Sequence, residues 1–296
     1  MNSYLIIKVY FMSSSNIYQP LVSIALTTFN GKNLLREQLD SILAQTYQNY
    51  EVVMSDDGSE ADTVAILNEF CSKDKRFRWS RSPLERGYRK NTENAISLCE
   101  GEIVILCDQD DVWFPNKIQS HVDAYKDPAV MWVYNRFVIT DGEGKEIGYI
   151  EDKMPDYFRH KTMLENAWGT CIGAAQTSYR TSVIKKALPI PSYCPAHDSW
   201  IQLVIYPAKP YFINEVLNTY RQHRNNMVGL DSGEDIGVIK ARERQAIDDN
   251  FRYIKLLTTN KVLPLWKRLF FKSVYIAKRT RTFLRKIIGK TDSRID

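Results

Sequence analysis

The first half of this chain predicts an α/β fold, in which helices cover both faces of a mostly parallel sheet. Short apolar runs alternate with helix-like segments between residues 20 and 140, which is the pattern of a doubly wound sheet. The run at 102–108 is almost entirely apolar, as expected of a strand buried on both faces. The 296 residues, 44% of them hydrophobic, suffice for one large domain, or for one domain with a tail.

The predicted elements follow one another in strand–helix order up to residue 108. Apolar, β-rich runs predict strands at 22–29, 51–55 and 102–108, and the segment "FRWSR" at 77–81 is expected to be a further strand. Apolar residues at helical spacing predict helices at 33–45, 62–71 and 90–99. The second of these helices is expected to open with an acidic N-cap.

After residue 140 the alternation fades. The glycine-bearing stretch "DGEGKEIG" at 141–148 predicts a hairpin turn between two extended segments. Beyond it we expect a helix at 161–167, a loop and strand at 169–180, a loop leading into a helix or buried strand at 192–206, a mobile polar loop at 221–237, and helix from about 238 onward.

Charge and cysteine content narrow the class of protein. The net charge is +5, yet ten Lys or Arg and no Asp or Glu lie between Lys261 and Lys290, so the rest of the chain is slightly acidic. Five cysteines without a CxxC pair indicate reduced thiols and neither a disulfide framework nor a zinc site. With no run of 18 apolar residues, these features favour a cytoplasmic protein.

Polar clusters follow three of the predicted strands. They are "TTFNG" at 27–31, "SDDGS" at 55–59 and "CDQDD" at 107–111. A single Asp after a strand often only caps the next helix, but ligands of open α/β sheets bind at the carboxyl ends of strands. Three clusters at equivalent ends therefore favour a ligand site.

The third cluster crowds carboxylates together. Asp108 and Asp110, two residues apart, can direct their carboxylates to one point, whereas Asp111 could instead cap the next helix. Mg²⁺ and Mn²⁺ take oxygen ligands, often one or two carboxylates together with substrate phosphates. A bound cation would relieve the repulsion and neutralise a diphosphate leaving group.

Four segments together resemble one enzyme family. The N-terminal stretch up to "SDDGSEADT", the segment "LCDQDDVWFPNKI", "AHDSW" at 196–200 and "YRQHRNN" at 220–226 resemble, in order and spacing, the motifs of glycosyltransferase family 2. The resemblance covers roughly residues 20–230. Within the family, "CDQDDVW" with "YRQHRNN" is most similar to transferases of bacterial surface polysaccharides, rhamnosyltransferases among them.

The resemblance implies an inverting, metal-dependent transferase of the GT-A fold. It would move a sugar, rhamnose being one possibility, from a UDP- or dTDP-sugar to a glycan acceptor, expected to be lipid-linked, in O-antigen or capsule synthesis. The implied organisation is an N-terminal extension (1–19), a catalytic domain (20–237, divided into 20–115 for the nucleotide and 116–237 for the acceptor) and a helical, basic tail (238–296).

The resemblance also implies roles for single residues. The expected general base is Asp198, and the expected metal ligands are Asp110, Asp108 and His223. The acceptor side would include His197 and Trp200, although His197 could simply begin a helix and Trp200 could be a core residue. The expected donor-binding residues are Thr28, Asn30, Asp56, Asp57, Arg89, Lys90, Asn91, Asp108, Arg221 and His223.

A helical count of the basic tail predicts an amphipathic helix. Its apolar stripe contains Val262, Trp266, Leu269, Ile276, Leu284 and Ile287. Lys267, Arg268, Lys278, Arg279, Arg285 and Lys286 are expected on the other side. Such a helix favours an anionic membrane surface, and hence a peripheral position at the inner face of the cell membrane, over nucleic acid. A helix packed on the domain with a solvated basic face is the remaining alternative.

Two other functions compete with the transferase. A haloacid-dehalogenase-type phosphatase also uses DxD after a strand, but after the first strand, whereas here it follows the fourth. A non-catalytic nucleotide-sugar- or glycan-binding module with a membrane tail stays open. The sequence leaves open the sugar, the acceptor, the linkage and the oligomeric state.

Overall fold

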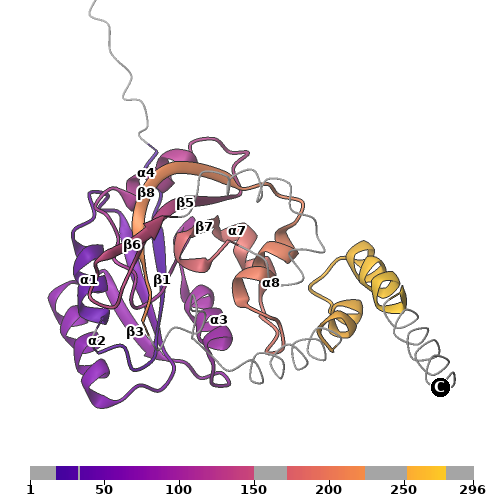
Figure 1. The fold of residues 1–296 in the computed structure, drawn as a ribbon, viewed down its shortest axis with the longest axis horizontal. Coiled ribbons are helices and arrows are strands. Elements are labelled where there is room, and N and C mark those ends of the chain that lie inside the picture. Colours follow the sequence, from indigo (N-terminus) through magenta and orange to yellow (C-terminus); the bar gives the residue numbers. More distant parts are fainter. Residues whose placement is uncertain (1–17, 33, 150–171, 224–251, 278–296) are drawn as a thin grey trace, which may run out of the picture.

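The computed structural model describes residues 18–32, 34–149, 172–223 and 252–277, and these form an eight-stranded sheet between two layers of helices (Figure 1). The strand order is β3-β2-β1-β4-β7-β5-β6, and β8 pairs with β5. The predicted α/β class is confirmed.

Every element predicted before residue 108 is present. The strands are β1 (Val22–Thr28), β2 (Tyr50–Asp56), β3 (Phe77–Arg81) and β4 (Ile103–Cys107), all paired in parallel. The helices between them are α1 (Leu35–Leu43), α2 (Ala61–Lys73) and α3 (Tyr88–Leu98). The acidic N-cap of α2 is Glu60, but its side chain makes no capping hydrogen bond.

The second half adds the strands that complete the sheet. Its elements are α4 (Lys117–Ala124), β5 (Trp132–Thr140), β6 (Glu146–Tyr149), η1 (Ala174–Gln176), β7 (Thr177–Arg180), α7 (Thr181–Ile184), η2 (Lys185–Ala187), α8 (His197–Ile205) and β8 (Tyr211–Arg221). The hairpin predicted around 141–148 is the antiparallel pair β5–β6. The segment 192–206 supplies a helix, α8, and the strand predicted within 169–180 is β7. The helix predicted at 161–167 lies outside the described residues.

Strand β8 was not predicted, and it matters most for the site. It pairs in parallel with β5, which runs in the same direction as β4 because β7 lies antiparallel between them. The carboxyl end of β8 therefore reaches the same edge of the sheet as those of β1, β2 and β4. The mobile loop predicted from 221 begins, in fact, with the last residue of this strand, and residues 224–237 lie outside the described part.

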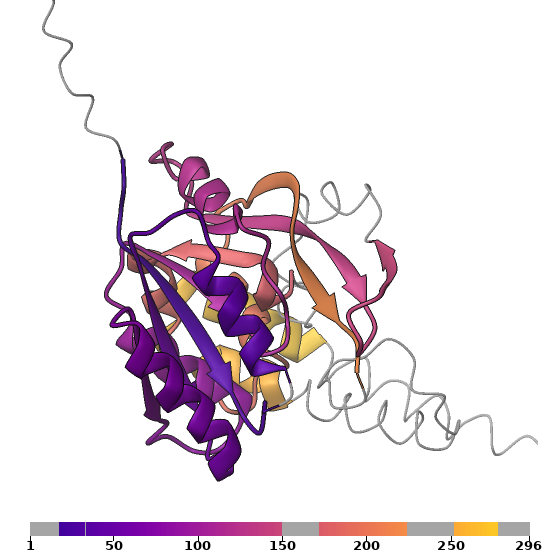
Figure 2. The ribbon, with the colours of Figure 1, turned by 90° about the vertical axis from the view of Figure 1, so that its left-hand side faces the viewer.

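Side chains of the sheet alternate between two hydrophobic cores. In β1, Ile24 and Leu26 belong to the core that α1, α2 and α4 cover, and Ala25 belongs to the core on the opposite face. In the view of Figure 2, α1 and α2 lie in front of the sheet and the C-terminal helices lie behind it. Burial of each large apolar side chain contributes about 1.5–3 kcal/mol, so these two cores fix the sheet that carries the site.

The C-terminal helices pack on the domain beside α8 (Figure 1). Residues 252–259 and 265–277 are helical, as predicted, and Leu257, Leu263 and Phe271 belong to the second core. The solvent-facing position predicted for Lys267 is wrong: the side chain is buried, and its Nζ donates to the carbonyls of Leu203 and Val204 in α8, at 2.8 and 2.7 Å. Helix 265–277 thus packs on the domain through the side that carries Lys267.

None of the helices in the described ranges combines the length and the apolar character needed to cross a bilayer.

Candidate active site

Four strands deliver polar residues to one edge of the sheet. Thr28 ends β1, Asp56 ends β2, Asp108 follows β4, and His223 lies two residues beyond β8. Since these strands are parallel, the clusters that the sequence analysis singled out lie along one edge, as we expected from the strand ends.

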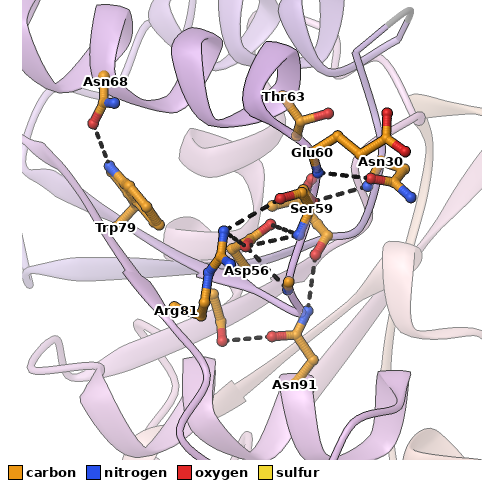
Figure 3. A network of polar contacts seen from close by, with 12 residues as sticks. Asn30, Asp56, Ser59, Glu60, Thr63, Asn68, Trp79, Arg81 and Asn91 are labelled. Carbon is orange, nitrogen blue, oxygen red and sulfur yellow. Dashed lines mark hydrogen bonds and ion pairs between the residues drawn. The ribbon is translucent and has the colours of Figure 1, made fainter.

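The side chain of Asp56 stabilises its own turn (Figure 3). Its side chain is completely buried, accepts the backbone N–H groups of Gly58 and Ser59, both at 3.0 Å, and pairs with Arg81 at 3.3 Å. Gly58 has φ +94°, which side-chain-bearing residues rarely adopt. Asp57 is only half-buried and accepts the N–H of Gly87 at 2.9 Å, which ties the β2 loop to the start of α3.

Thr28 and Asn91 also lie beneath the surface. Thr28 Oγ1 donates to Oε1 of Gln109 at 2.7 Å. Asn91 donates to the Thr28 carbonyl at 3.2 Å and accepts from Ser55 Oγ at 2.6 Å, so it links α3 to β1 and β2. Asn30 has a left-handed backbone, φ 49°, and its Oδ1 accepts the N–H of Glu60. The hydrogen bonds of these side chains hold the ends of β1 and β2 and the start of α3 together.

Gln109 is a site residue that the sequence analysis missed. Its side-chain amide also accepts the N–H of Phe29 at 3.0 Å and donates to the Phe29 carbonyl at 3.1 Å. It therefore joins the β1 loop to the β4 loop. Its place between the two aspartates of the DxD was the available signal.

The first turn of α3 holds the segment that leads into α8. Arg89 and the Tyr88 hydroxyl both donate to the carbonyl of Pro195, at 2.8 and 3.0 Å. Lys90 forms an ion pair with Glu93 at 2.7 Å. Of the predicted basic contacts to a nucleotide, Arg89 thus reaches toward the α8 side of the site, and Lys90 is paired within its own helix.

Three carboxylates and one imidazole come together from separate segments. Asp110 Oδ2 lies 2.9 Å from His223 Nε2. Burial, followed by the charges of Asp110 and Asp198, raises the pKa of Asp108 to about 7. Asp198 is thus close enough to act on the DxD electrostatically, although it comes from α8. Burial and neighbouring like charges both disfavour the ionised form of a carboxyl group, which is why its pKa rises.

Asp111 does not cap the next helix, and that alternative is wrong. It is buried, and its Oδ1 accepts the backbone N–H of Arg221 at 3.0 Å, whereas the N-cap residue of α4 is Asn116. Burial, followed by the Asp110 and Asp108 charges, raises its pKa well above the usual range.

Main-chain bonds extend this link between the DxD segment and β8. The N–H of Thr219 donates to the carbonyl of Val112 at 2.8 Å, and the N–H of Phe114 donates to that of Leu217 at 2.9 Å. This register brings His223 next to Asp110. Arg221 itself is buried and its guanidinium pairs with Glu37 on α1 at 2.7 Å.

A buried lysine lies behind the carboxylates. Lys117 Nζ donates to the carbonyl of Ala175 and to Asn218 Oδ1, at 2.6 and 2.9 Å. Burial lowers its pKa to about 7, and the charges of Asp111 and Asp108 oppose that shift. Its positive field partly offsets the acidic cluster. In the sequence analysis this position appeared only within the segment "LCDQDDVWFPNKI" and received no role.

Helix α8 begins with the residues predicted for catalysis. Asp198 is half-buried in the first turn, and its Oδ1 accepts the N–H of Ser199 at 2.7 Å. His197 is nearly buried against the Tyr88 ring, and burial lowers its pKa. Its Nδ1 has no hydrogen-bond partner among the described residues.

Trp200 is a core residue, so the prediction of a sugar platform is wrong. The side chain has no exposed surface, belongs to the second core, and donates from Nε1 to the Ala187 carbonyl at 2.6 Å. The other alternative, a structural tryptophan, is the one that the structure supports.

The potential metal ligands are few. The described residues contain no group of three or more His, Cys, Asp and Glu side chains arranged to hold a metal ion. Asp110 and His223 do converge, and one carboxylate with one imidazole is a donor set that a transition-metal cation such as Mn²⁺ accepts.

Comparison with known families decides the class. The family model of Glycosyl transferase family 2 matches residues 23–188, which is more than half of the chain. The chain belongs to glycosyltransferase family 2. The expectation of this family from the chain's motifs is thereby confirmed.

Curated relatives agree with this assignment. An uncharacterised glycosyltransferase of Rickettsia felis is 35% identical over 139 residues, which cover 46% of this chain and 23% of that protein. The UDP-Glc:alpha-D-GlcNAc-diphosphoundecaprenol beta-1,3-glucosyltransferase WfaP of Escherichia coli is 29% identical over 119 residues, which cover 40% of this chain and 47% of WfaP. The match spans less than half the length of either relative.

Solved structures show the fold of this family 2 chain. The mannosyltransferase PcManGT from Pyrobaculum calidifontis, in complex with GDP-Man and Mn²⁺, has a TM-score of 0.57 at 18% identity, covering 88% of this chain and 70% of that one. S. aureus TarS 1–349 in complex with UDP-GlcNAc has a TM-score of 0.56 at 15% identity, covering 86% and 71%. The predicted GT-A fold is confirmed.

Proposed function

We propose that this family 2 chain is an inverting, metal-dependent transferase that moves a sugar from a UDP- or dTDP-sugar to a lipid-linked glycan. The observation that carries the proposal is the convergence of Asp108, Asp110 and Asp198 with His223 at one edge of the sheet. Acids from the DxD loop and from α8 thereby face the same space, as a donor site and an acceptor site must in a direct displacement.

Asp57 is the proposed base-reading residue. Asp56 is buried in its turn, whereas Asp57 is half-buried at the same strand end. A carboxylate there can accept the imide N–H of uracil or thymine, which favours a pyrimidine nucleotide. WfaP is named for UDP-Glc and TarS was solved with UDP-GlcNAc, whereas PcManGT was solved with GDP-Man. Rhamnose stays one candidate among the sugars.

Asp110 and His223 are the proposed ligands of a divalent cation, with Asp108 beside them. This small donor set fits an ion that completes its coordination with two phosphates of the donor. When bound, Mn²⁺ or Mg²⁺ supplies positive charge against the departing diphosphate. The Arg89 guanidinium, held near Pro195, lies on the α8 side of the site and adds positive charge there.

Asp198 is the proposed general base. It removes the proton from the acceptor hydroxyl while that oxygen attacks the anomeric carbon from the face opposite the diphosphate. The new glycosidic C–O bond forms as the bond to the diphosphate oxygen breaks, and the configuration inverts. His197, at the same helix start, packs against the ring of Tyr88 and so fixes the first turn of α8 that carries this carboxylate.

A lipid-linked acceptor accords with one relative and with the basic C-terminus. WfaP is named for a diphosphoundecaprenol-linked acceptor. Nine of the ten Lys or Arg between 261 and 290, all except the buried Lys267, would hold the enzyme at an anionic membrane where such an acceptor resides. We therefore assign the chain to bacterial surface-polysaccharide synthesis, such as O-antigen or capsule, at the inner face of the cell membrane.

A donor screen tests the chemistry. The full chain is incubated with UDP-glucose, UDP-N-acetylglucosamine, dTDP-rhamnose or GDP-mannose and Mn²⁺, with acceptor glycolipids, and nucleotide diphosphate release is measured. We expect release from a UDP- or dTDP-sugar. Asp198→Asn should lower the rate about 10²–10⁴-fold while donor binding is retained. Asp123→Asn, on the exposed side of α4, is the matched control.

Three results would contradict the proposal, in whole or in part. No release with any donor would favour a binding module. Full diphosphate release by Asp198→Asn would overturn the assignment of Asp198 as the general base. Release from GDP-mannose alone would overturn the pyrimidine assignment and keep the transferase.

A further inference from the structure

Helix 265–277 has a second apolar face that points away from the domain. Its inward side carries the buried Lys267 and Phe271. Its outward side carries five large apolar residues: Leu265, Trp266, Leu269, Phe270 and Ile276, which are 61%, 51%, 55%, 37% and 55% exposed. At 3.6 residues per turn these five fall within one arc of about 140°, so they form a continuous outward face.

This grouping differs from the rest of the described surface. Other exposed large apolar residues are distributed over separate elements and loops, namely Phe29, Leu84, Leu98, Ile147, Tyr193 and Tyr211. Single exposed apolar side chains are ordinary in soluble proteins, but a contiguous patch marks a surface that binds something.

We propose that the outward face of helix 265–277 inserts its apolar side chains into the headgroup region of an anionic lipid bilayer. The proposal deepens the membrane association in the proposed function and rests on it. Lys272 is exposed next to the face, Arg268 flanks it, and residues 261–290 carry no acidic side chain. A Trp- and Leu-bearing face bordered by basic residues is the composition of helices that lie in the membrane interface.

The basic residues and the apolar face of helix 265–277 together favour an anionic bilayer over a nucleic acid or a second copy of the chain. A nucleic acid would be bound by basic side chains and would leave five apolar side chains in water. A second copy of the chain would bring its own Arg268 and Lys272 to the contact, and these like charges would repel. An anionic bilayer accommodates both features at once.

Lys267 joins this face to the catalytic helix. Its ammonium is buried against the carbonyls of Leu203 and Val204 at the end of α8, and Asp198 lies in the first turn of the same helix. Helix α8 has nine residues and is about 13 Å long, so this one short helix connects the contact with Lys267 to the proposed general base, Asp198. Docking of helix 265–277 therefore orients α8 relative to the bilayer.

Vesicle co-sedimentation of the full chain tests the face. The vesicles contain equal parts phosphatidylethanolamine and phosphatidylglycerol, and phosphatidylcholine vesicles serve as the neutral comparison. We expect Leu269→Glu and Ile276→Glu each to weaken partitioning onto the anionic vesicles about tenfold or more. Ile147→Glu, at an equally exposed apolar position on β6, should leave partitioning unchanged.

Parallel measurements separate the alternatives. Diphosphate release with a water-soluble acceptor should be the same in Leu269→Glu as in the wild type. If the wild type releases no diphosphate, the proposed transferase function is wrong, and the vesicle experiment still tests membrane binding by the outward face. Unchanged partitioning of both variants would overturn the inference. So would a shift from dimer to monomer in lipid-free light scattering, which would assign the face to a second copy. A fall in the unfolding temperature of both variants would show that the chain itself covers the face.

Discussion

Asp56 and Asp57 are adjacent in the chain, yet the structure gives their carboxylates different surroundings. Asp56 accepts two backbone N–H groups of its own loop and pairs with Arg81 at the end of β3. Asp57 accepts one N–H, from Gly87, and keeps part of its surface exposed. One residue stabilises the loop, and the neighbour is free to take a further hydrogen bond from a ligand.

Substituting each in turn should separate these roles. Asp56→Ala removes a buried charge and leaves Arg81 and two N–H groups unpaired, so we expect a loss of about 2–4 kcal/mol in the free energy of unfolding. Asp57→Ala should cost less than 1 kcal/mol and raise KM for the nucleotide-sugar about tenfold or more. Urea unfolding and donor titration measure both quantities. The reassignment fails if Asp56→Ala is as stable as the wild type.

Sequence patterns located these residues but not their orientation. Strand ends mark where Thr28, Asp56 and Asp108 lie, because parallel strands finish at a common edge. Which carboxylate turns inward depends on the positive φ at Gly58 and on Arg81 from β3, and neither is written in a local motif. Trp200 was misassigned to the acceptor side for the same reason, since α8 rotates it into the core.

Among the elements, β8 is a strand that the alternation of apolar and polar residues does not predict. Its inward positions, such as Ile213 and Leu217, are interrupted by polar residues and by register shifts opposite Asn135 and Arg136, so strict alternation is lost. Strands β1, β2 and β4 are buried almost throughout and read clearly as apolar runs, whereas β3 is only partly buried. Strand β8, which places His223, is therefore the strand that the sequence pattern does not predict.

The contact between helix 265–277 and α8 should leave a signature in pH. Burial lowers the pKa of Lys267 from 10.5 to about 8. Below pH 8 the amine is protonated in the folded and unfolded states alike, so its buried charge costs a constant amount. Between pH 8 and about 10 the folded state releases this proton and the unfolded state keeps it, so the stability that this residue contributes rises with pH.

The substitution Lys267→Met removes this pH-dependent contribution of Lys267 to stability. We expect the unfolding temperature of the wild type to rise relative to Lys267→Met between pH 8 and 10, with no change in the difference between pH 6 and 7.5. Circular dichroism melts of both proteins measure it, and Lys272→Met on the exposed side of the same helix is the control. Parallel curves for wild type and Lys267→Met across that window would contradict the burial of this charge.

At the scale of the whole molecule, the predicted tail divides into two parts. Residues 252–277 contribute Leu257, Leu263 and Phe271 to the second core and so belong to the folded domain. Six of the ten basic residues counted between 261 and 290 lie beyond residue 277. The predicted boundary at 238 does not separate a core from an appendage.

Two truncations should therefore behave differently. Removing 278–296 should leave the unfolding temperature unchanged and weaken binding to anionic vesicles, because about 1 kcal/mol is lost per basic residue at the surface. Removing 262–296 takes Leu263 and Phe271 out of the core, and we expect a loss of several kcal/mol in the free energy of unfolding. Melting curves and vesicle sedimentation at two salt concentrations test this. Equal unfolding temperatures for the two truncations would refute it.

The bond from Asp111 to the N–H of Arg221 joins two points that are far apart in the order of synthesis. A ribosome adding about 5–20 residues per second needs roughly 6–23 s to travel from Asp110 to His223. Throughout that interval the nascent chain displays its three crowded aspartates without the strand that receives one of them and the imidazole that meets another. Under the proposed function, we expect sugar transfer only once nearly the whole domain has emerged, so a chain that ends before His223 should be inactive.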